Sequence, residues 1–282
     1  MCSAACRTAR RCSTAGPEVG ARIPGRHRAV ITGAGGGIGA AIARRLAPGA
    51  DALILVGRRA APLQALRAEL PVPVQLVCGD LTEAATLAAI ESAARAAGGV
   101  NLLVNNAGVS GFHSFETQPA DAIRAMLDTN LLAPMLLTRQ LLPQLLQAPS
   151  AQIVNIGSVL GSLGFPGFAA YGASKAGLAG FSQALRRELS DTGVEVRHFA
   201  PRATRTGINS DAVSAMNGEL KTAEDTPEAV AAEFIAFLEG TAWQRTLGAG
   251  ERFFVLLNKL LPGLPDGAIR KQLPVIRKHL PK

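Results

Sequence analysis

Short apolar runs rich in Val, Ile and Leu recur along the chain, and each is followed by a longer segment of helical length. The runs occupy residues 29–33, 52–57, 74–78, 101–106, 152–158 and 194–200. Runs with so few polar positions are typical of strands that are buried on both faces. Because strand and helix alternate, the pattern indicates βαβ units and predicts a parallel sheet covered by helices on both faces.

The six runs predict a single doubly wound α/β domain of the Rossmann type over residues 28–250. A short seventh strand is expected near 244–248, and a C-terminal helical extension at 251–282 is expected to hold helices around 251–261 and 265–279. Residues 1–27 are rich in Arg, Ala and Ser, and Glu18 is their only acid. We interpret them as a disordered extension or the product of a misassigned start codon, with an organelle transit peptide as the alternative.

Composition narrows the class of protein only in part. Hydrophobic residues make up 48% and charged residues 18% of the 282 residues, which is typical of a globular protein. No apolar stretch reaches the length of a transmembrane helix. The net charge is +8, but the sequence contains no nucleic-acid-binding motif, so we expect no nucleic-acid partner. Binding of an anionic cofactor or of an anionic membrane surface would account for part of this charge.

The cysteines indicate neither a disulfide framework nor a metal site. Cys2, Cys6 and Cys12 lie close to the N-terminus, Cys78 ends an apolar run, and no CxxC pair is present. A reducing, cytoplasmic location is therefore the expectation.

The first strand runs directly into a glycine-rich turn, and a helix follows. Thr32 and Gly33 end the strand, and Gly35, Gly37 and Gly39 lie in the turn. Glycines let backbone N–H groups approach a pyrophosphate closely, and the helix N-terminus favours that anion. A strand before the turn and a helix after it make this a candidate dinucleotide-binding element.

The end of the second strand bears on the choice of cofactor. An acid there would bind the 2′-hydroxyl of NAD, whereas an arginine would accommodate the 2′-phosphate of NADP. The chain has Val56-Gly57-Arg58-Arg59 at this place. We favour NADP, with NAD as the alternative; the arginines could also simply begin a solvated helix.

Several motifs then coincide in order and spacing, and together they resemble the classical short-chain dehydrogenase/reductase family over residues 28–240. The TGxxxGxG turn is followed by an NNAG element at 105–108, by Asn130, by Ser158, and by Tyr171 and Lys175 thirteen and seventeen residues beyond Ser158. Asp80 matches the aspartate that contacts adenine in this family. The resemblance implies a nicotinamide-dependent oxidoreductase that assembles as a homodimer or homotetramer.

The resemblance also implies the roles of individual residues. Tyr171 would be the acid/base, Ser158 would hydrogen-bond the reacting oxygen, Lys175 would also bind the ribose, and Asn130 would hold a water in a proton relay. No metal is expected. The expected cofactor-binding residues are Thr32, Gly33, Gly35, Gly37, Ile38, Gly39, Arg58, Arg59, Asp80, Leu81, Asn106, Ala107, Gly108, Tyr171, Lys175, Pro201 and Thr206.

Tyr171 and Lys175 are four residues apart, so on a helix their side chains share a face. A neighbouring ammonium favours the phenolate and is expected to lower the pKa of the tyrosine. Lowering a pKa from about 10 to about 7 requires roughly 4 kcal/mol, to which the positive nicotinamide ring could contribute.

Two segments depart from the family pattern. Arg202 stands where the family usually has a glycine after Pro201, and we expect Arg202 or Arg205 to contact a cofactor phosphate or an acidic substrate group. The C-terminal segment replaces a glycine-rich ending with two basic amphipathic helices. We favour packing over the substrate cleft or on a neighbouring subunit; contact with an anionic membrane is the alternative.

The expected activity is hydride transfer between NADP(H) and the carbonyl or hydroxyl carbon of a small molecule. A lipophilic substrate is expected, because the loops that should form the pocket carry Leu160, Leu163, Phe165, Phe168 and Phe112, with residues 205–220 beside them. The alternatives are an NAD-dependent alcohol dehydrogenase and a non-catalytic, nicotinamide-sensing protein.

Overall fold

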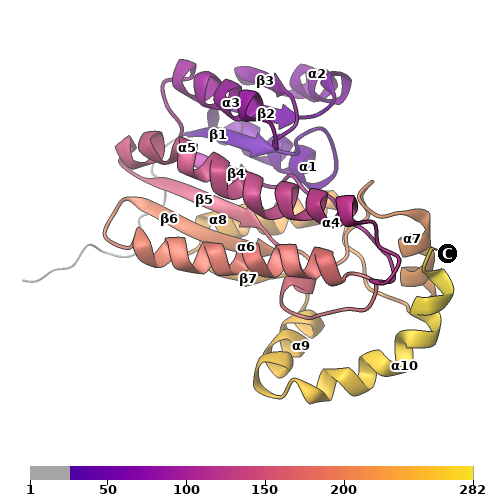
Figure 1. Ribbon diagram of the computed structural model, residues 1–282. Coiled ribbons are helices and arrows are strands. Elements are labelled where there is room, and N and C mark those ends of the chain that lie inside the picture. Colours follow the sequence, from indigo (N-terminus) through magenta and orange to yellow (C-terminus); the bar gives the residue numbers. More distant parts are fainter. Residues whose placement is uncertain (1–25, 282) are drawn as a thin grey trace, which may run out of the picture.

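The computed structural model describes residues 26–281, and nearly all of the expected N-terminal extension, with three of the four cysteines, lies outside them. A seven-stranded parallel sheet forms the centre of this part of the chain (Figure 1). Its strands are β1 (His27–Thr32), β2 (Ala50–Gly57), β3 (Val74–Cys78), β4 (Leu102–Asn105), β5 (Ala151–Ile156), β6 (Val194–Ala200) and β7 (Gln244–Thr246). The predicted strands and the doubly wound fold are confirmed.

The strand order is β3-β2-β1-β4-β5-β6-β7, and every neighbouring pair is parallel. The direction of winding reverses between β1 and β4. In such sheets the loops that leave these two strands diverge and open a crevice at the carboxyl edge. The topology therefore places a binding crevice beside Thr32 and Asn105, the last residues of the two strands.

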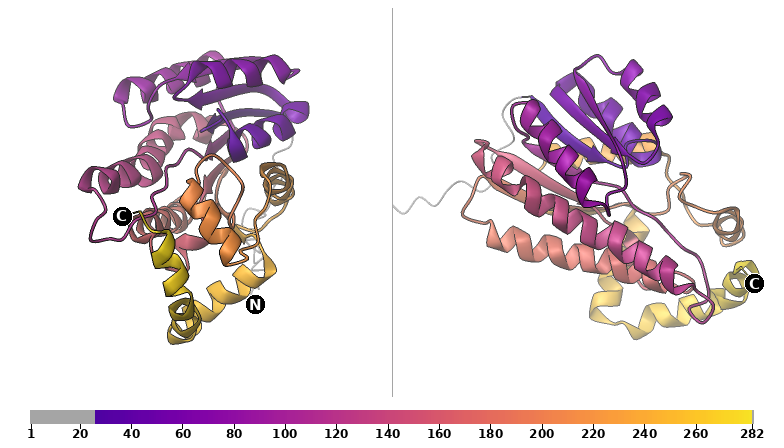
Figure 2. Two further views of the ribbon diagram at one scale, coloured as in Figure 1. Left: turned by 90° about the vertical axis from the view of Figure 1, so that its right-hand side faces the viewer. Right: turned by 45° about the horizontal axis from the view of Figure 1, so that its top comes forward.

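Helices cover both faces of the sheet, as the apolar strands require (Figures 1 and 2). On one face α1 (Gly37–Leu46), α2 (Ala60–Glu69) and α8 (Pro227–Glu239) enclose one core cluster. On the other face α3 (Ala84–Ala96), α5 (Ala133–Gln147) and α6 (Ala169–Glu188) enclose a second cluster, and α4 (Ala120–Leu127) leads into α5.

A buried arginine joins the end of α8 to β6. Arg197 on β6 is 1% exposed and donates to the carbonyls of Leu238, Gly240 and Ala242 at 2.7–3.1 Å. The last carbonyls of a helix have no partner within the helix, so this guanidinium completes the C-terminus of α8. It thereby holds the segment that leads into β7.

Three helices lie beyond the carboxyl edge of the sheet: α7 (Asp211–Glu219), α9 (Ala249–Leu260) and α10 (Gly263–His279). The two expected C-terminal helices are confirmed, within two residues at each end. Ile276 of α10 is buried in an apolar cluster with Phe112, Phe168, Val213 and Met216. Among the described residues, no helix is long and apolar enough to cross a membrane.

Candidate active site

The glycine-rich turn packs tightly against the start of α1 while its tip stays open. A Cβ on Gly39 would lie 2.4 Å from the Gly33 carbonyl oxygen, so the start of α1 approaches the turn too closely for any side chain. Among the described residues, nothing lies within 4 Å of the corresponding position on Gly36, the N-cap of α1, and no side chain caps that helix. Free helix N–H groups facing open space are the arrangement that binds a phosphate group.

A cavity of about 650 Å³ begins at this turn and continues across the carboxyl ends of β4, β5 and β6. It is large enough for a cofactor together with part of a substrate. Most of the expected site residues line it: Gly33, Gly35, Gly37, Ile38, Arg58, Arg59, Asn106, Ala107, Gly108, Ser158, Tyr171, Lys175, Pro201 and Thr206.

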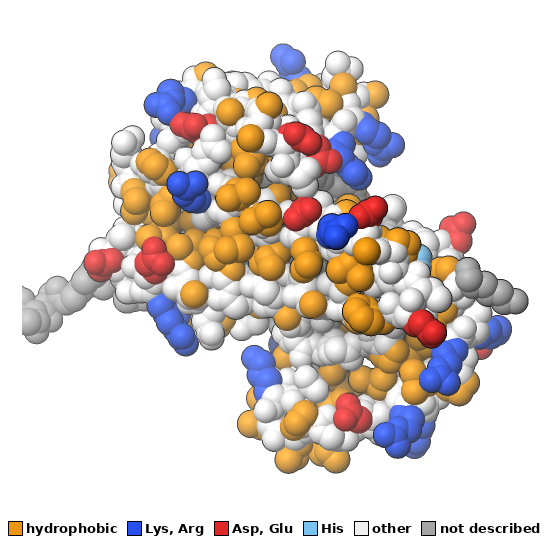
Figure 3. Space-filling model, viewed as in Figure 1, with side chains coloured by type: hydrophobic (Ala, Val, Ile, Leu, Met, Phe, Trp, Pro, Cys, Tyr) orange, Lys and Arg blue, Asp and Glu red, His pale blue; other side chains and the backbone are white. Residues whose placement is uncertain are grey.

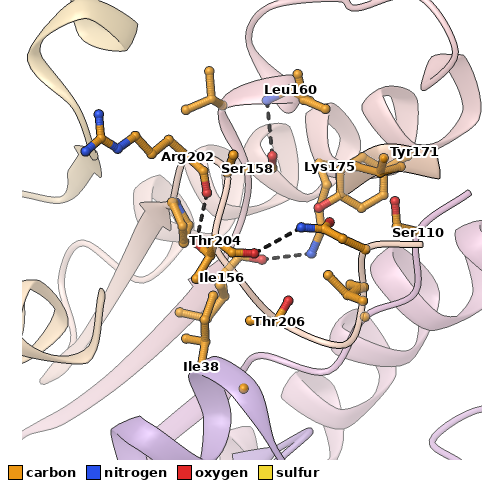
Figure 4. A pocket seen from close by; sticks show the side chains of 18 of the residues that line it. Ile38, Ser110, Ile156, Ser158, Leu160, Tyr171, Lys175, Arg202, Thr204 and Thr206 are labelled. Atoms are coloured by element: carbon orange, nitrogen blue, oxygen red, sulfur yellow. Dashed lines mark hydrogen bonds between the residues drawn. The ribbon is translucent and has the colours of Figure 1, made fainter. Parts of the chain in front are cut away.

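Ser158, Tyr171 and Lys175 converge on the middle of this cavity (Figure 4). Ser158 follows β5, and its hydroxyl oxygen accepts a hydrogen bond from the Leu160 N–H at 3.1 Å, which leaves its proton available. Tyr171 and Lys175 lie in the first turns of α6. The Lys175 ammonium donates to the Ile156 carbonyl at 3.0 Å and lies 5.9 Å from the centre of the Tyr171 ring.

The expected acidification of Tyr171 by Lys175 is wrong for the protein by itself. Burial raises the pKa of Tyr171, and interaction with the Ser158 side chain lowers it by less. Burial also lowers the pKa of Lys175 to about 8, because a buried ammonium loses its hydration. The phenol therefore stays protonated at neutral pH, and a tyrosinate would need additional positive charge in the cavity.

Asn130 lies just behind the cavity wall, fully buried in the π-helical turn Asp128–Leu132 between α4 and α5. Its amide accepts from the Val109 N–H at 2.8 Å and donates to the Val109 carbonyl and the Ser174 hydroxyl at 2.9 and 3.0 Å. π-Helical turns are rare and are frequent at functional sites. The sequence spacing pointed to Asn130 but carried no signal for this local geometry.

The remaining expected residues support the cavity rather than line it. The Thr32 hydroxyl accepts from the N–H groups of Asn106 and Ala107 at 2.9 and 3.0 Å, and so joins the turn to the loop after β4. Asp80 is bound by the Thr82 N–H and hydroxyl, which lower the pKa of the carboxyl, with a smaller effect from the charge of Arg58. Leu81 is buried in the second core cluster.

Arg202 lines the cavity, but its charge is already balanced. Its guanidinium donates to both carboxylate oxygens of Asp225 at 3.0 and 2.7 Å and lies 3.6 Å from Glu251. The expectation that Arg202 binds a cofactor phosphate or an acidic substrate group is therefore not supported. Arg205 is exposed and does not line the cavity.

The outer part of the cavity includes residues that sequence reasoning did not single out. Leu160, Leu163, Phe165 and Phe168 line it as expected, whereas Phe112 stands behind Phe168 with ring centres 5.1 Å apart. Asn209, Met216 and Asn217 line it from the expected segment 205–220, whereas the residues that sequence reasoning did not single out include Ser110, Glu251 and Gln272. Glu251 and Gln272 come from α9 and α10, so the preferred interpretation that these helices pack over the cleft agrees with the structure.

Comparison with known proteins agrees with this geometry. A sulfoacetaldehyde reductase of Chromohalobacter salexigens is 39% identical over 185 residues, which are 62% of this chain and 72% of that protein. The structure of a short-chain dehydrogenase from Burkholderia cenocepacia in complex with NADP has a TM-score of 0.74 and 28% identity, covering 82% of this chain and all of that one. A short-chain dehydrogenase from Sphingobium yanoikuyae in complex with NADPH has a TM-score of 0.70 and 31% identity, with 86% and 94% covered.

The sequence profile of the family described as short chain dehydrogenase matches residues 27–217, well over half of the chain. That range includes the glycine-rich turn, Asn130, Ser158, Tyr171 and Lys175. The chain therefore belongs to the short chain dehydrogenase family of oxidoreductases.

Proposed function

We propose that this oxidoreductase transfers hydride between NADP(H) and the carbonyl or hydroxyl carbon of a lipophilic small molecule. The observation that carries the proposal is the convergence of Ser158, Tyr171 and Lys175 on one cavity that begins at the glycine-rich turn. The free N-terminus of α1 and the open space at Gly36 fit a pyrophosphate. When bound, the dinucleotide would supply the hydride.

The side chains around the reacting carbonyl would hold and deliver the proton. Burial keeps the Tyr171 hydroxyl protonated, which suits a general acid that donates to a carbonyl oxygen. The free proton of the Ser158 hydroxyl can donate to the same oxygen. Lys175 and Asn130 approach the same part of the cavity wall, because the Asn130 Oδ1 and the Lys175 Nζ both lie within 3.5 Å of the position that a Cβ on Gly108 would occupy. They can therefore bind the ribose and a relay water.

Arg58 and Arg59 support the preference for NADP. Both are exposed, and both line the cavity beyond the end of β2, where a 2′-phosphate would lie. Of the described lining residues only Glu251 carries a carboxylate, and it lies beside Arg202 rather than beside these arginines. An arginine holds a phosphate through charge-assisted, bidentate hydrogen bonds.

Cofactor preference is tested by titrating NADP and NAD separately into the protein. Arg58→Ala and Arg59→Ala should each weaken NADP binding about 10- to 100-fold, the value of one charged hydrogen bond, and leave NAD binding unchanged. Arg67→Ala on the exposed surface of α2 is the matched control. Tighter binding of NAD by the unmodified protein would favour the NAD-dependent alternative.

The chemical step is tested by NADPH oxidation with a series of ketones. Tyr171→Phe keeps the ring and removes the proton donor, so it should lower kcat by about 10²- to 10⁴-fold with NADPH affinity retained. Equal turnover by both proteins would contradict the proposed acid. A medium-chain 2-alkanone should be reduced with a higher kcat/KM than acetone, because Leu160, Leu163 and Phe165 line the substrate end of the cavity.

A homodimer is part of the proposal, supported by an exposed apolar band along α4 and α5. Leu127, Leu132, Met135 and Leu136 are all partly exposed there, and Figure 3 shows the hydrophobic side chains gathered across this face. A contiguous apolar band of this kind is typical of a subunit interface. Leu132→Glu should shift the mass measured by light scattering from that of a dimer to that of a monomer.

A further inference from the structure

Helices α9 and α10 form a bent arm that extends away from the sheet, below α6 in Figure 1. One side of the arm is anchored to the rest of the protein. Val255 and Ile276 are buried, the Asn258 amide donates to the Ser162 carbonyl at 3.0 Å, and Lys278 donates to Glu219 at 2.8 Å. The orientation of the arm is therefore set, and its outer side is presented to the surroundings.

That outer side is strongly apolar. Phe253, Leu256 and Leu260 follow the spacing of one helical face of α9 and are 61%, 56% and 68% exposed. Leu261 and Leu264, at the bend between the helices, are 55% and 58% exposed. We call these five residues the arm face. Scattered apolar residues are common on a surface, but a continuous patch of large side chains marks a site of interaction.

Basic side chains border the arm face along α9. Arg252 and Lys259 are seven residues apart and exposed, so they border the apolar face of α9. Together α9 and α10 carry six Lys or Arg residues and two carboxylates, and one of the carboxylates, Glu251, lies beside Arg202. Figure 3 shows hydrophobic side chains along the lower edge of the arm with basic side chains beside them.

We infer that the arm face docks on an anionic lipid bilayer. An amphipathic helix with a large apolar face and basic borders lies in the plane of a membrane interface, with its apolar side chains among the acyl chains. The cations then meet the lipid phosphates. A second copy of this chain is a poorer partner, because two arms placed face to face would bring their cations together.

The position of the arm connects docking with the cavity. Glu251 of α9 and Gln272 of α10 line the cavity on their inner side, while the arm face lies on the outer side of the same helices. Docking would therefore hold the outer end of the cavity beside the bilayer surface. If the proposed function holds, a lipophilic carbonyl compound dissolved in the bilayer would reach Tyr171 along this wall.

The inference is tested by sedimentation of the full chain with vesicles. Vesicles of phosphatidylcholine with about one third phosphatidylserine should carry the protein into the pellet, and vesicles of phosphatidylcholine alone should carry much less. Raising the salt from 0.1 to 0.5 M should release most of it, because exposed charges are screened over a few ångströms. No pelleting with anionic vesicles, or pelleting that ignores both lipid charge and salt, would overturn the inference.

Two variants locate the contact. Phe253→Ser/Leu260→Ser should abolish pelleting, while Leu146→Ser, which removes an exposed leucine at the far end of α5, should not change it. Arg252→Gln/Lys259→Gln should weaken binding about thirtyfold, since each cation near an anionic surface is worth a factor of about five. Pelleting that survives the change Phe253→Ser/Leu260→Ser would overturn the inference. It would also be overturned if the unmodified protein did not bind vesicles and this change converted a dimer into a monomer, because the arm face would then be a contact between two copies of the chain.

Activity distinguishes this inference from the proposed function. The apolar double variant should reduce a water-soluble ketone at the rate of the unmodified protein, because neither residue lines the cavity. If this variant no longer binds vesicles but keeps full reductase activity, the result supports both the docking inference and the proposed function. Vesicle binding by a protein with no reductase activity would leave the docking inference standing and refute the proposed function.

Discussion

His198 provides the sharpest quantitative prediction, because its imidazole is buried without a hydrogen-bond partner. It lies on β6, it is 1% exposed, and neither ring nitrogen has a partner among the described residues. The ring is in close contact with Gly157, where a Cβ would lie 2.2 Å from the Nε2 atom. Burial, and then the charges of Lys175 and Lys259, lower the pKa of His198 to about 4 from its ordinary value of 6.5.

The lowered pKa of His198 makes the folded protein less stable in acid. Between pH 6.5 and 4 the unfolded chain holds a proton on His198 and the folded protein does not, so the unfolded state binds more protons and stability falls as the pH falls. The contribution of His198 to the free energy of unfolding is constant above pH 6.5, and it levels off again below pH 4. A difference of about 2.5 pKa units corresponds to about 3 kcal/mol, of which about 2.5 kcal/mol is lost by pH 4.5.

The assay is urea unfolding of the unmodified protein and of His198→Met at intervals from pH 7.5 to pH 4.5. Carboxylates paired in the fold also lose their partners on acidification, but this loss is common to both proteins. The free energy of unfolding of His198→Met should therefore fall by about 2–3 kcal/mol less than that of the unmodified protein over this range. Parallel profiles would refute the reasoning, since they would mean that the buried imidazole titrates at the same pH when folded and unfolded.

Three further changes probe the packing around the site. Gly39→Ala should lower the free energy of unfolding by about 1–3 kcal/mol and weaken NADP(H) binding, because the added methyl group meets the backbone of the turn. Thermal melts measure the effect on stability. The control is Gly180→Ala on the open surface of α6, which should slightly stabilise the protein. Arg202→Met should cost about 1–3 kcal/mol by leaving Asp225 unpaired, and a second change, Asp225→Leu, should recover part of this in a double-mutant cycle. Arg197→Met should cost about 3 kcal/mol in urea unfolding, because the carbonyls of Leu238, Gly240 and Ala242 lose the hydrogen bonds of the guanidinium.

For each of these variants, one result would contradict the physical reason given. A Gly39→Ala protein as stable as the original would show that the turn can move away from α1. Additive effects of the changes at Arg202 and Asp225 would show that the two side chains do not interact in solution. For Arg197 the informative variant is Arg197→Lys, because full stability in it would mean that charge rather than the number of donors matters.

The sequence alone determined the sheet, the glycine-rich turn and the order of the catalytic motif. Strands buried on both faces must be almost entirely apolar, so the runs predicted each strand to within two residues at either end. The first turn of α1 admits only glycine at Gly39, because the Gly33 carbonyl oxygen lies 2.4 Å from the position of a Cβ there, and such a steric requirement is visible in the sequence. The spacing of Tyr171 and Lys175 follows from the helical repeat, which is equally local.

Only the tertiary structure decided what depends on neighbours distant in the chain. Arg202 is paired with Asp225 and Glu251, which are 23 and 49 residues away, and no local pattern indicates that its charge is balanced. The pKa of Tyr171 is raised rather than lowered, because the loss of hydration depends on everything that packs around the ring. The amphipathic pattern predicted α9 and α10, but which side of each faces the cavity and which is exposed is a property of the assembled fold.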